Sequence, residues 1–172
     1  MIEIIAYILS IIGYLFFVLS CALKKKNQML ITQNGNHLLN GIAQAIMQGY
    51  SGMIQDIISF IRNIFILFNK NNKILSFIFI ALGLSLGIIF NNNGWLGLLP
   101  VISSLIYSII VLFSNNVIII KTAICFSNVC WAIYCYAIVL YTGLIFNVIA
   151  LVFSIISLAH CIIKRNNRLK AY

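Results

Sequence analysis

The hydrophobic positions of the chain fall into seven long runs separated by short polar stretches. Each run has about 16–23 residues, which as an α-helix spans roughly 24–35 Å, near the about 30 Å thickness of the apolar bilayer core. The runs cover residues 4–23, 29–47, 53–68, 74–90, 96–113, 117–139 and 144–163. The pattern predicts an all-α integral membrane protein with about seven transmembrane helices in a single membrane domain, residues 1–172. The second run is the weakest prediction, because it is rich in amides.

The composition excludes a water-soluble domain. Hydrophobic residues make up 63% of the chain and charged residues only 8%, whereas a globular domain has about 25% charged residues. A soluble protein of this size would expose too much apolar surface, and a bilayer removes that cost. The net charge of +9 does not indicate nucleic acid as a partner, because the basic residues lie between the apolar runs.

The basic residues predict the orientation in the membrane. With seven spans and the N-terminus outside, ten of the 11 basic residues lie on the inner side. They are Lys24, Lys25, Lys26, Lys70, Lys73, Lys121, Lys164, Arg165, Arg168 and Lys170. The outer loops, 48–52, 91–95 and 140–143, contain none. We therefore expect an outer N-terminus and a basic cytoplasmic tail at residues 164–172.

A shift of 91 residues superposes two halves of the chain. Tyr50 and Gly52 in a turn of the first half then fall on Tyr141 and Gly143 in the second. The shift predicts a three-helix repeat at residues 4–68, a linker helix at 74–90 and a second three-helix repeat at 96–163. One linker helix gives both repeats the same orientation, about an axis along the membrane normal. Transporters often bind their solute between such halves.

The second apolar run carries one polar face. Its side chains recur at intervals of four, three and four residues, within an arc of about 60° on a helix. These residues are Gln33, His37, Asn40 and Gln44. The positions related to the last three by the repeat are Asn128, Trp131 and Cys135. Two interpretations stay open: the two faces line a central polar cavity, or their amides bond helix to helix.

Three further residues in the spans are candidates for function. Asp56 is the one acidic residue within a span, and the repeat places Asn147 at the related position. A protonatable carboxyl there can couple transport to protons or an ion; the alternatives are an ion pair and a hydrated helix end. Arg62 either holds an anionic group or anchors at the lipid headgroups. Asp56 and Arg62 lie about 120° apart around their helix, so we do not expect them to pair.

The sequence shows no sign of an enzyme or a cofactor site. It has no Gly-rich phosphate loop, no paired carboxylates and no Ser–His–Asp set. His37 lacks a second metal ligand at helical spacing, so we expect no metal site. We predict no catalytic residues.

Several short motifs indicate a family. They are Gly49-Tyr50 with Gly52, then Ile61-Arg62, Leu98-Leu99-Pro100-Val101-Ile102 and Cys130-Trp131-Ala132-Ile133. In these motifs, over nearly its whole length, the chain resembles the YgjV family of bacterial inner-membrane proteins. The resemblance implies an inner-membrane location and no particular activity.

The plan of three, one and three helices is distantly similar to the SWEET and PQ-loop transporters. In that resemblance each half gives an asparagine of its third helix to a central site. Asn147 has a comparable place here, and Asp56 replaces the asparagine of the first half. The chain lacks the Pro-Gln pairs, and its single proline, Pro100, stands at the outer start of the fifth span.

Two functions remain from the sequence. The first is a transporter or facilitator for a small solute, with its pathway between the repeats. The alternative is a non-transporting membrane subunit or assembly partner that uses its polar faces for helix association. In both, the chain lies in a lipid bilayer, and association as a homo-oligomer stays open.

Overall fold

The computed structural model describes residues 2–22, 26–68, 73–114 and 116–170. Within these ranges the chain forms seven α-helices and one short 3-10 helix, with no strand, so the predicted all-α fold is confirmed. The elements are α1 (Ile2–Ala22), α2 (Lys26–Ile46), α3 (Tyr50–Leu67), α4 (Lys73–Ile89), η1 (Leu96–Leu98), α5 (Leu99–Phe113), α6 (Val117–Ala137) and α7 (Tyr141–Lys170).

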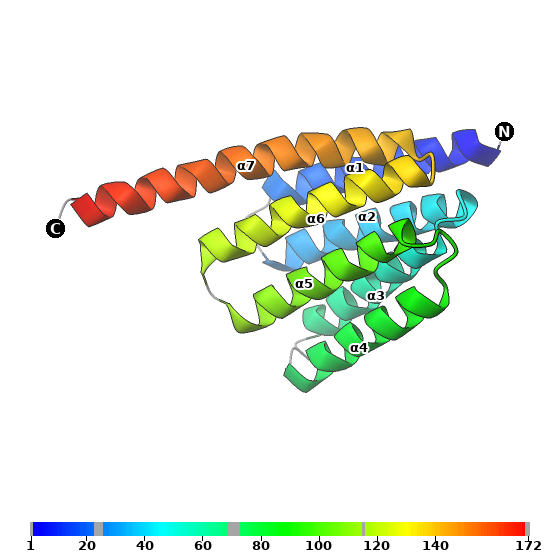
Figure 1. Cartoon of the computed structure of the whole chain (residues 1–172), viewed down its shortest axis with the longest axis horizontal. Helices are drawn as coiled ribbons and strands as arrows, with labels where there is room; N and C mark the ends of the chain where they lie inside the picture. The colour runs from blue at the N-terminus through cyan, green and yellow to red at the C-terminus, as the bar shows by residue number, and fades with distance from the viewer. Residues whose placement is uncertain (1, 23–25, 69–72, 115, 171–172) are drawn as a thin grey trace.

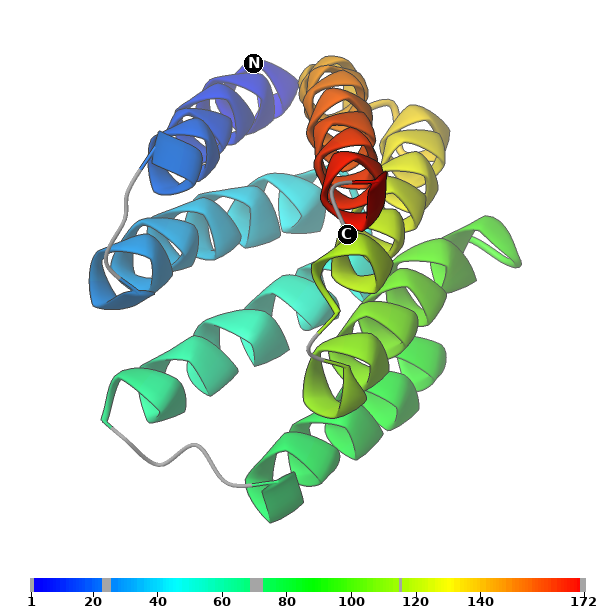
Figure 2. The same cartoon turned by 90° about the vertical axis from the view of Figure 1, so that its left-hand side faces the viewer.

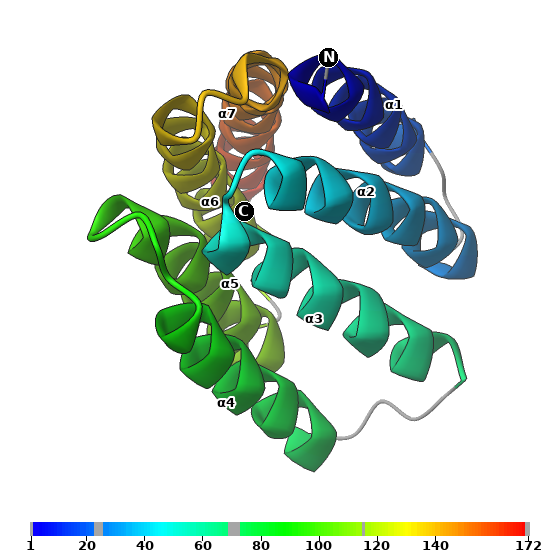
Figure 3. The same ribbon diagram turned by 90° about the vertical axis from the view of Figure 1, so that its right-hand side faces the viewer.

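The helices run roughly along the long axis of the molecule and alternate in direction, so the two ends of the chain lie at opposite ends (Figure 1). Each helix packs against its neighbours in sequence, and contacts of α1 with α7 and of α3 with α5 join the two halves. Seen end-on, α1–α3 form one side and α5–α7 the other, with α4 between α3 and α5 (Figures 2 and 3). This is a bundle of two three-helix units with α4 as the linker.

Many large apolar side chains are exposed on the outer faces of the helices, where a bilayer would cover them. Among the described residues, three helical segments are long and apolar enough to cross a membrane: Ile2–Leu19, Ile118–Ala137 and Tyr141–Ile163. Two shorter apolar segments, Ile74–Ile89 and Leu96–Ile110, lie in α4, η1 and α5. The buried positions hold many small or polar residues, including Ala6, Ser10 and Ala43. Small residues inside and large apolar residues outside are typical of helices that pack within lipid.

Two identical backbone turns, 91 residues apart, end the middle helices α2 and α6. Gln48 and Val139 both adopt the left-handed conformation, with φ of 57° and 60°. In the first turn the Gly49 N–H donates to the Gln44 carbonyl at 2.7 Å; in the second, the Leu140 N–H donates to the Cys135 carbonyl at 2.8 Å. This bond pattern is the Schellman motif.

The turns are shorter than the sequence pattern predicts. We expected the third and last spans to begin at residues 53 and 144, but α3 and α7 begin at Tyr50 and Tyr141. The reason is that the motif reverses the chain within three residues, so the next helix restarts at once. Gly52 and Gly143 therefore lie inside the first turn of a helix. At the other end α7 continues to Lys170, so the backbone of the expected tail is helical that far, and residues 171–172 lie outside the described part.

Each of these turns is held by a segment from outside its own repeat. The Tyr7 hydroxyl of α1 donates to the Val139 carbonyl oxygen at 2.8 Å. The Asn92 amide, which follows α4, donates to the Gln48 carbonyl oxygen at 2.7 Å. The halves are thus fastened to each other at the end of the bundle where both turns lie.

The structure does not test two predictions, the inner location of three lysines and the sidedness of the termini. Lys24, Lys25 and Lys70 fall outside the described residues. The sidedness of the termini remains a prediction from charge, although their placement at opposite ends of the bundle suits an odd number of spans.

Candidate functional site

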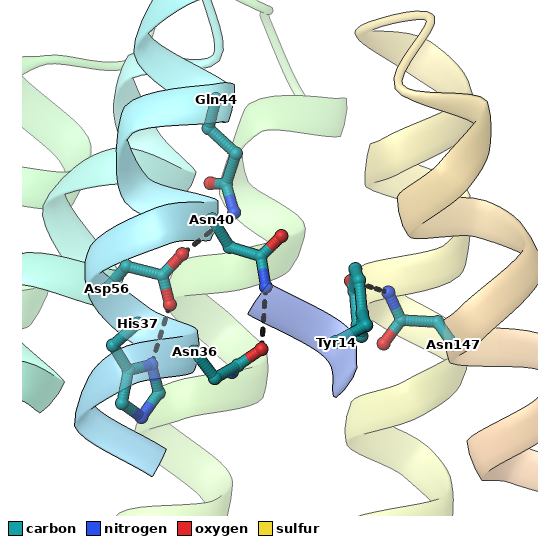
Figure 4. A network of polar contacts seen from close by, with 7 residues as sticks. All are labelled: Tyr14, Asn36, His37, Asn40, Gln44, Asp56 and Asn147. Carbon is teal, nitrogen blue, oxygen red and sulfur yellow. Dashed lines mark hydrogen bonds and ion pairs between the residues drawn. The ribbon is translucent and has the colours of Figure 1, made fainter. Parts of the chain in front are cut away.

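Asp56 of α3 is bonded to the polar face of α2. His37 Nδ1 lies 2.8 Å from Asp56 Oδ1, and Gln44 Nε2 donates to Asp56 Oδ2 at 2.9 Å (Figure 4). Only 5% of Asp56 is exposed. The alternatives to a proton or ion site for this carboxyl were an ion pair and a hydrated helix end. The structure shows a partner for the carboxyl, the His37 imidazole on the adjacent helix α2.

Two glycines allow the helices to approach closely at this carboxyl. Gly41 lies between His37 and Gln44 on the same face of α2, and a Cβ there would sit 3.4 Å from the Cβ of Asp56. At Gly52 of α3 an added Cβ would lie 2.0 Å from Gln44 Oε1. A larger residue at Gly52 would therefore displace the Gln44 amide from its bond with Asp56.

Asn40 faces α1 rather than α3. Its Nδ2 atom donates to Asn36 Oδ1 of the same helix at 2.6 Å, and a Cβ added at Gly13 of α1 would lie 2.9 Å from that nitrogen. Asn40 Oδ1 and Gln44 Oε1 are both buried and have no hydrogen-bond partner among the described residues. The polar face of α2 therefore has acceptor oxygens that receive no hydrogen bond from the described residues of a neighbouring helix.

The related position in the second repeat also forms a buried polar contact. Asn147 Nδ2 lies 2.6 Å from Tyr14 Oη of α1, 2.8 Å from the Gly143 carbonyl oxygen and 3.8 Å from Cys135 Sγ. Gln44 with Asp56 and Cys135 with Asn147 are the same pair of positions in the two repeats. Because Tyr14 belongs to the first repeat, the Asn147 contact crosses between the halves (Figure 4).

We group these two sets of polar contacts, the second of which crosses between the halves, as the junction site: Tyr14, His37, Asn40, Gln44, Asp56, Tyr134, Cys135 and Asn147. Tyr134 is fully buried, and its hydroxyl oxygen accepts the Gly52 N–H of α3 at 3.1 Å. The junction site therefore combines groups from both repeats.

Other candidates lie outside the junction site. Asn128 of α6 donates to Ser154 Oγ of α7 at 3.3 Å, which is a bond from helix to helix. Arg62 lies 3.3 Å from Ser108 Oγ of α5 and not at Asp56. Gln33 is half-buried, one turn before His37.

Trp131 has a packing contact at the edge of the site. Its ring meets the ring of Tyr134 edge-to-face, with centroids 6.0 Å apart and planes at 84°. It is half-buried against the small apolar core that includes Tyr134 and Leu140. The ring therefore supports Tyr134, whose hydroxyl reaches α3.

Sequence reasoning missed two members of this site, Tyr14 and Tyr134. Both lie in apolar runs, where a tyrosine is ordinarily counted as a hydrophobic residue. For Tyr14 the neighbouring residues could have indicated its role. Tyr14 follows Gly13, and Ser10 lies one turn earlier, a pattern typical of a helix face that packs closely through polar groups.

Comparison with known proteins gives a family and no close relative. The model of the family Imp-YgjV, described as bacterial inner membrane protein, matches residues 4–165. No curated protein matches the chain. No solved structure matches it either, so the similarity to SWEET transporters has no support from a solved fold.

Proposed function

The chain belongs to the Imp-YgjV family of bacterial inner membrane proteins, and on this premise we propose that it carries a small solute across that membrane in exchange for a proton. The junction site is where the solute binds. The observation that carries the proposal is the buried Asp56 carboxyl, held by His37 and Gln44 at the meeting of the two halves.

A buried carboxyl in a membrane protein is costly, so its presence indicates a function. An acidic side chain at membrane depth costs about 2.5–3.5 kcal/mol on insertion scales, and such residues commonly mark ion or proton pathways. Amides that serve only to join helices would use their acceptor oxygens in bonds to a neighbouring helix. Asn40 and Gln44 leave theirs without a partner, which favours a ligand site over polar association.

The His37–Asp56 pair can hold and release one proton. The His37 imidazole and the Asp56 carboxyl share one hydrogen bond, so a proton can lie on either partner. The His37 side chain is 21% exposed, against 7% for Asp56, so the imidazole is the member through which a proton can reach the pair.

Flux measurements on the purified protein in vesicles test the proposal. With a pH-sensitive dye inside the vesicles, neutral, cationic and anionic small solutes are added in turn to the outside. We expect at least one class to move protons, and we expect Asp56→Asn and His37→Ala to abolish the signal. Asn128→Ala, which alters a polar residue outside the junction site, is the matched control and keeps it. Solute-driven flux that survives Asp56→Asn, or no flux with any class, contradicts the proposal.

A second candidate is a non-transporting subunit, and the second repeat provides the observation that favours it. There the polar side chains bond helix to helix, as Asn128 does with Ser154, and Ser103 with Ser127 at 2.6 Å. This function predicts that another membrane protein co-purifies in fixed proportion and that no small solute changes the stability of the chain.

A further inference from the structure

We propose that the solute bound at the junction site is a small organic monocation with N–H groups, such as an alkylammonium. The inference rests on the proposed function for transport, but binding can be tested separately. Its basis is the excess of hydrogen-bond acceptors around Asp56.

Asp56, Asn40 and Gln44 leave several acceptor positions unfilled. Each oxygen of Asp56 takes one bond, from His37 and from Gln44, whereas a carboxylate can accept about four. Asn40 Oδ1 and Gln44 Oε1 add two buried acceptors without a partner. The nearby amide nitrogens of Gln44 and Asn147 are already directed at protein acceptors. An ammonium group has three donors and no acceptor, so it matches this set better than a hydroxyl, which brings an acceptor of its own.

The charge at the site also favours a monocation. The sequence has two acidic residues, Glu3 and Asp56, and Glu3 lies at the start of α1. The titratable group in contact with Asp56 is His37 of α2, and Tyr134 of α6 reaches the same helix α3 at Gly52. With His37 neutral the site carries one negative charge, which one monocation balances.

The acceptor set suits a monocation better than a divalent cation. Ca²⁺ takes 6–8 oxygen ligands and Mg²⁺ keeps an octahedral shell, whereas one carboxylate and two amide oxygens provide few. Buried aromatic rings, Tyr14 and Tyr134, border the site from the other helices, and such rings suit an alkyl chain or a cation.

The proton and the cation would then compete for one carboxylate. A proton held by the His37–Asp56 pair neutralises the charge that the ammonium needs, and a bound ammonium disfavours protonation of the pair. Binding is therefore tighter at higher pH, and the competition gives the exchange of one cation for one proton.

Four small probes test the inference on the purified full-length chain in detergent, in phosphate buffer without amines. They are ethylammonium, tetramethylammonium, ethanol and acetate, each compared with NaCl at the same ionic strength. Calorimetry and thermal unfolding report binding, since a ligand of the folded state raises its stability. We expect ethylammonium to bind, and to bind more tightly as the pH is raised. Tetramethylammonium, which has the charge without N–H donors, binds at least tenfold more weakly, and ethanol and acetate do not bind.

Variants locate the site. Asp56→Asn reduces ethylammonium affinity at least tenfold, and Asn40→Ala, which keeps the carboxyl, reduces it several-fold. Asn128→Ala leaves it unchanged. Equal binding of ethanol or acetate overturns the inference, as does ethylammonium affinity that is unchanged in folded Asn40→Ala and Asp56→Asn.

The test also separates this inference from the proposed function. Ethylammonium that binds the wild type but moves no protons in vesicles supports the inference and contradicts transport. Proton flux driven only by neutral or anionic solutes supports transport and contradicts the inference.

Discussion

Replacing Val139 by glycine should make the protein more stable, which is the reverse of the usual effect of glycine. Val139 has a φ of 60°, and a β-branched residue is strongly disfavoured in that region. The left-handed conformation costs an L-residue about 1–2 kcal/mol, and glycine removes this cost. Glycine adds about 0.5–1 kcal/mol of conformational entropy to be lost on folding. The net expectation is a gain of roughly 0.5–1 kcal/mol.

The carbonyl that accepts the Tyr7 hydroxyl belongs to the backbone, so this bond survives in Val139→Gly. The matched control is Val148→Gly within α7, because the two valines are equally exposed, 46% and 45%. There glycine weakens a helix, and stability falls by about 0.4 kcal/mol or more. Unfolding of the purified protein by SDS, followed by far-ultraviolet circular dichroism, compares both with the wild type. If Val139→Gly unfolds at the same or a lower SDS fraction than the wild type, the reasoning from backbone strain is wrong.

Four further predictions follow from the packing and the topology. Tyr134→Phe leaves the Gly52 N–H without its acceptor and costs about 1–3 kcal/mol in the same unfolding assay; the exposed Tyr136→Phe on the same helix is neutral within about 0.5 kcal/mol. Gly52→Ala drives a Cβ into Gln44 and costs about 1–3 kcal/mol, and ethylammonium affinity falls as well. Asn128→Ala costs about 0.6–1.7 kcal/mol, as for other bonds between membrane helices, without a change in solute binding. Reporter fusions at the two termini should place the N-terminus outside and the C-terminus inside, and two termini on one side would contradict seven spans.

The helices could be predicted from the sequence because lipid imposes one simple condition on them. Every backbone polar group must be bonded within its segment, so each apolar run of sufficient length becomes a helix. The predicted ends of the helices were less accurate. Left-handed residues at helix ends are most often glycine, but here they are Gln48 and Val139, so nothing in the sequence marked the turns as tight.

Three polar side chains of the site, His37, Gln44 and Asp56, could be predicted, but not how they pair. Helical periodicity selected His37 and Gln44, and the scarcity of acids selected Asp56. Their contact depends on the register of α2 against α3, which the tight turn sets. Once Gln48 is known to be the reversal point, counting eight residues in each direction reaches Asn40 and Asp56. Asp56 is thereby placed between His37 and Gln44, so the missing information was the turn conformation.

The contacts between the halves could not be predicted at all. Tyr14 with Asn147 and Tyr134 with Gly52 join residues 133 and 82 positions apart in the chain. Neither pair is repeated at the positions that the 91-residue shift relates, since Tyr134 corresponds to Ala43. Only the assembled bundle brings them together.

The paired positions of Asp56 and Asn147 show what joining two repeats in one chain makes possible. In a symmetric dimer of a single repeat both positions would hold the same residue. Two aspartates would bury two negative charges in one bundle, and two asparagines would leave no charge. A covalent link through α4 frees the two positions to differ. One half can then hold the ionisable group while the other provides a neutral amide, a division of chemistry that no pair of identical subunits related by an exact axis can have.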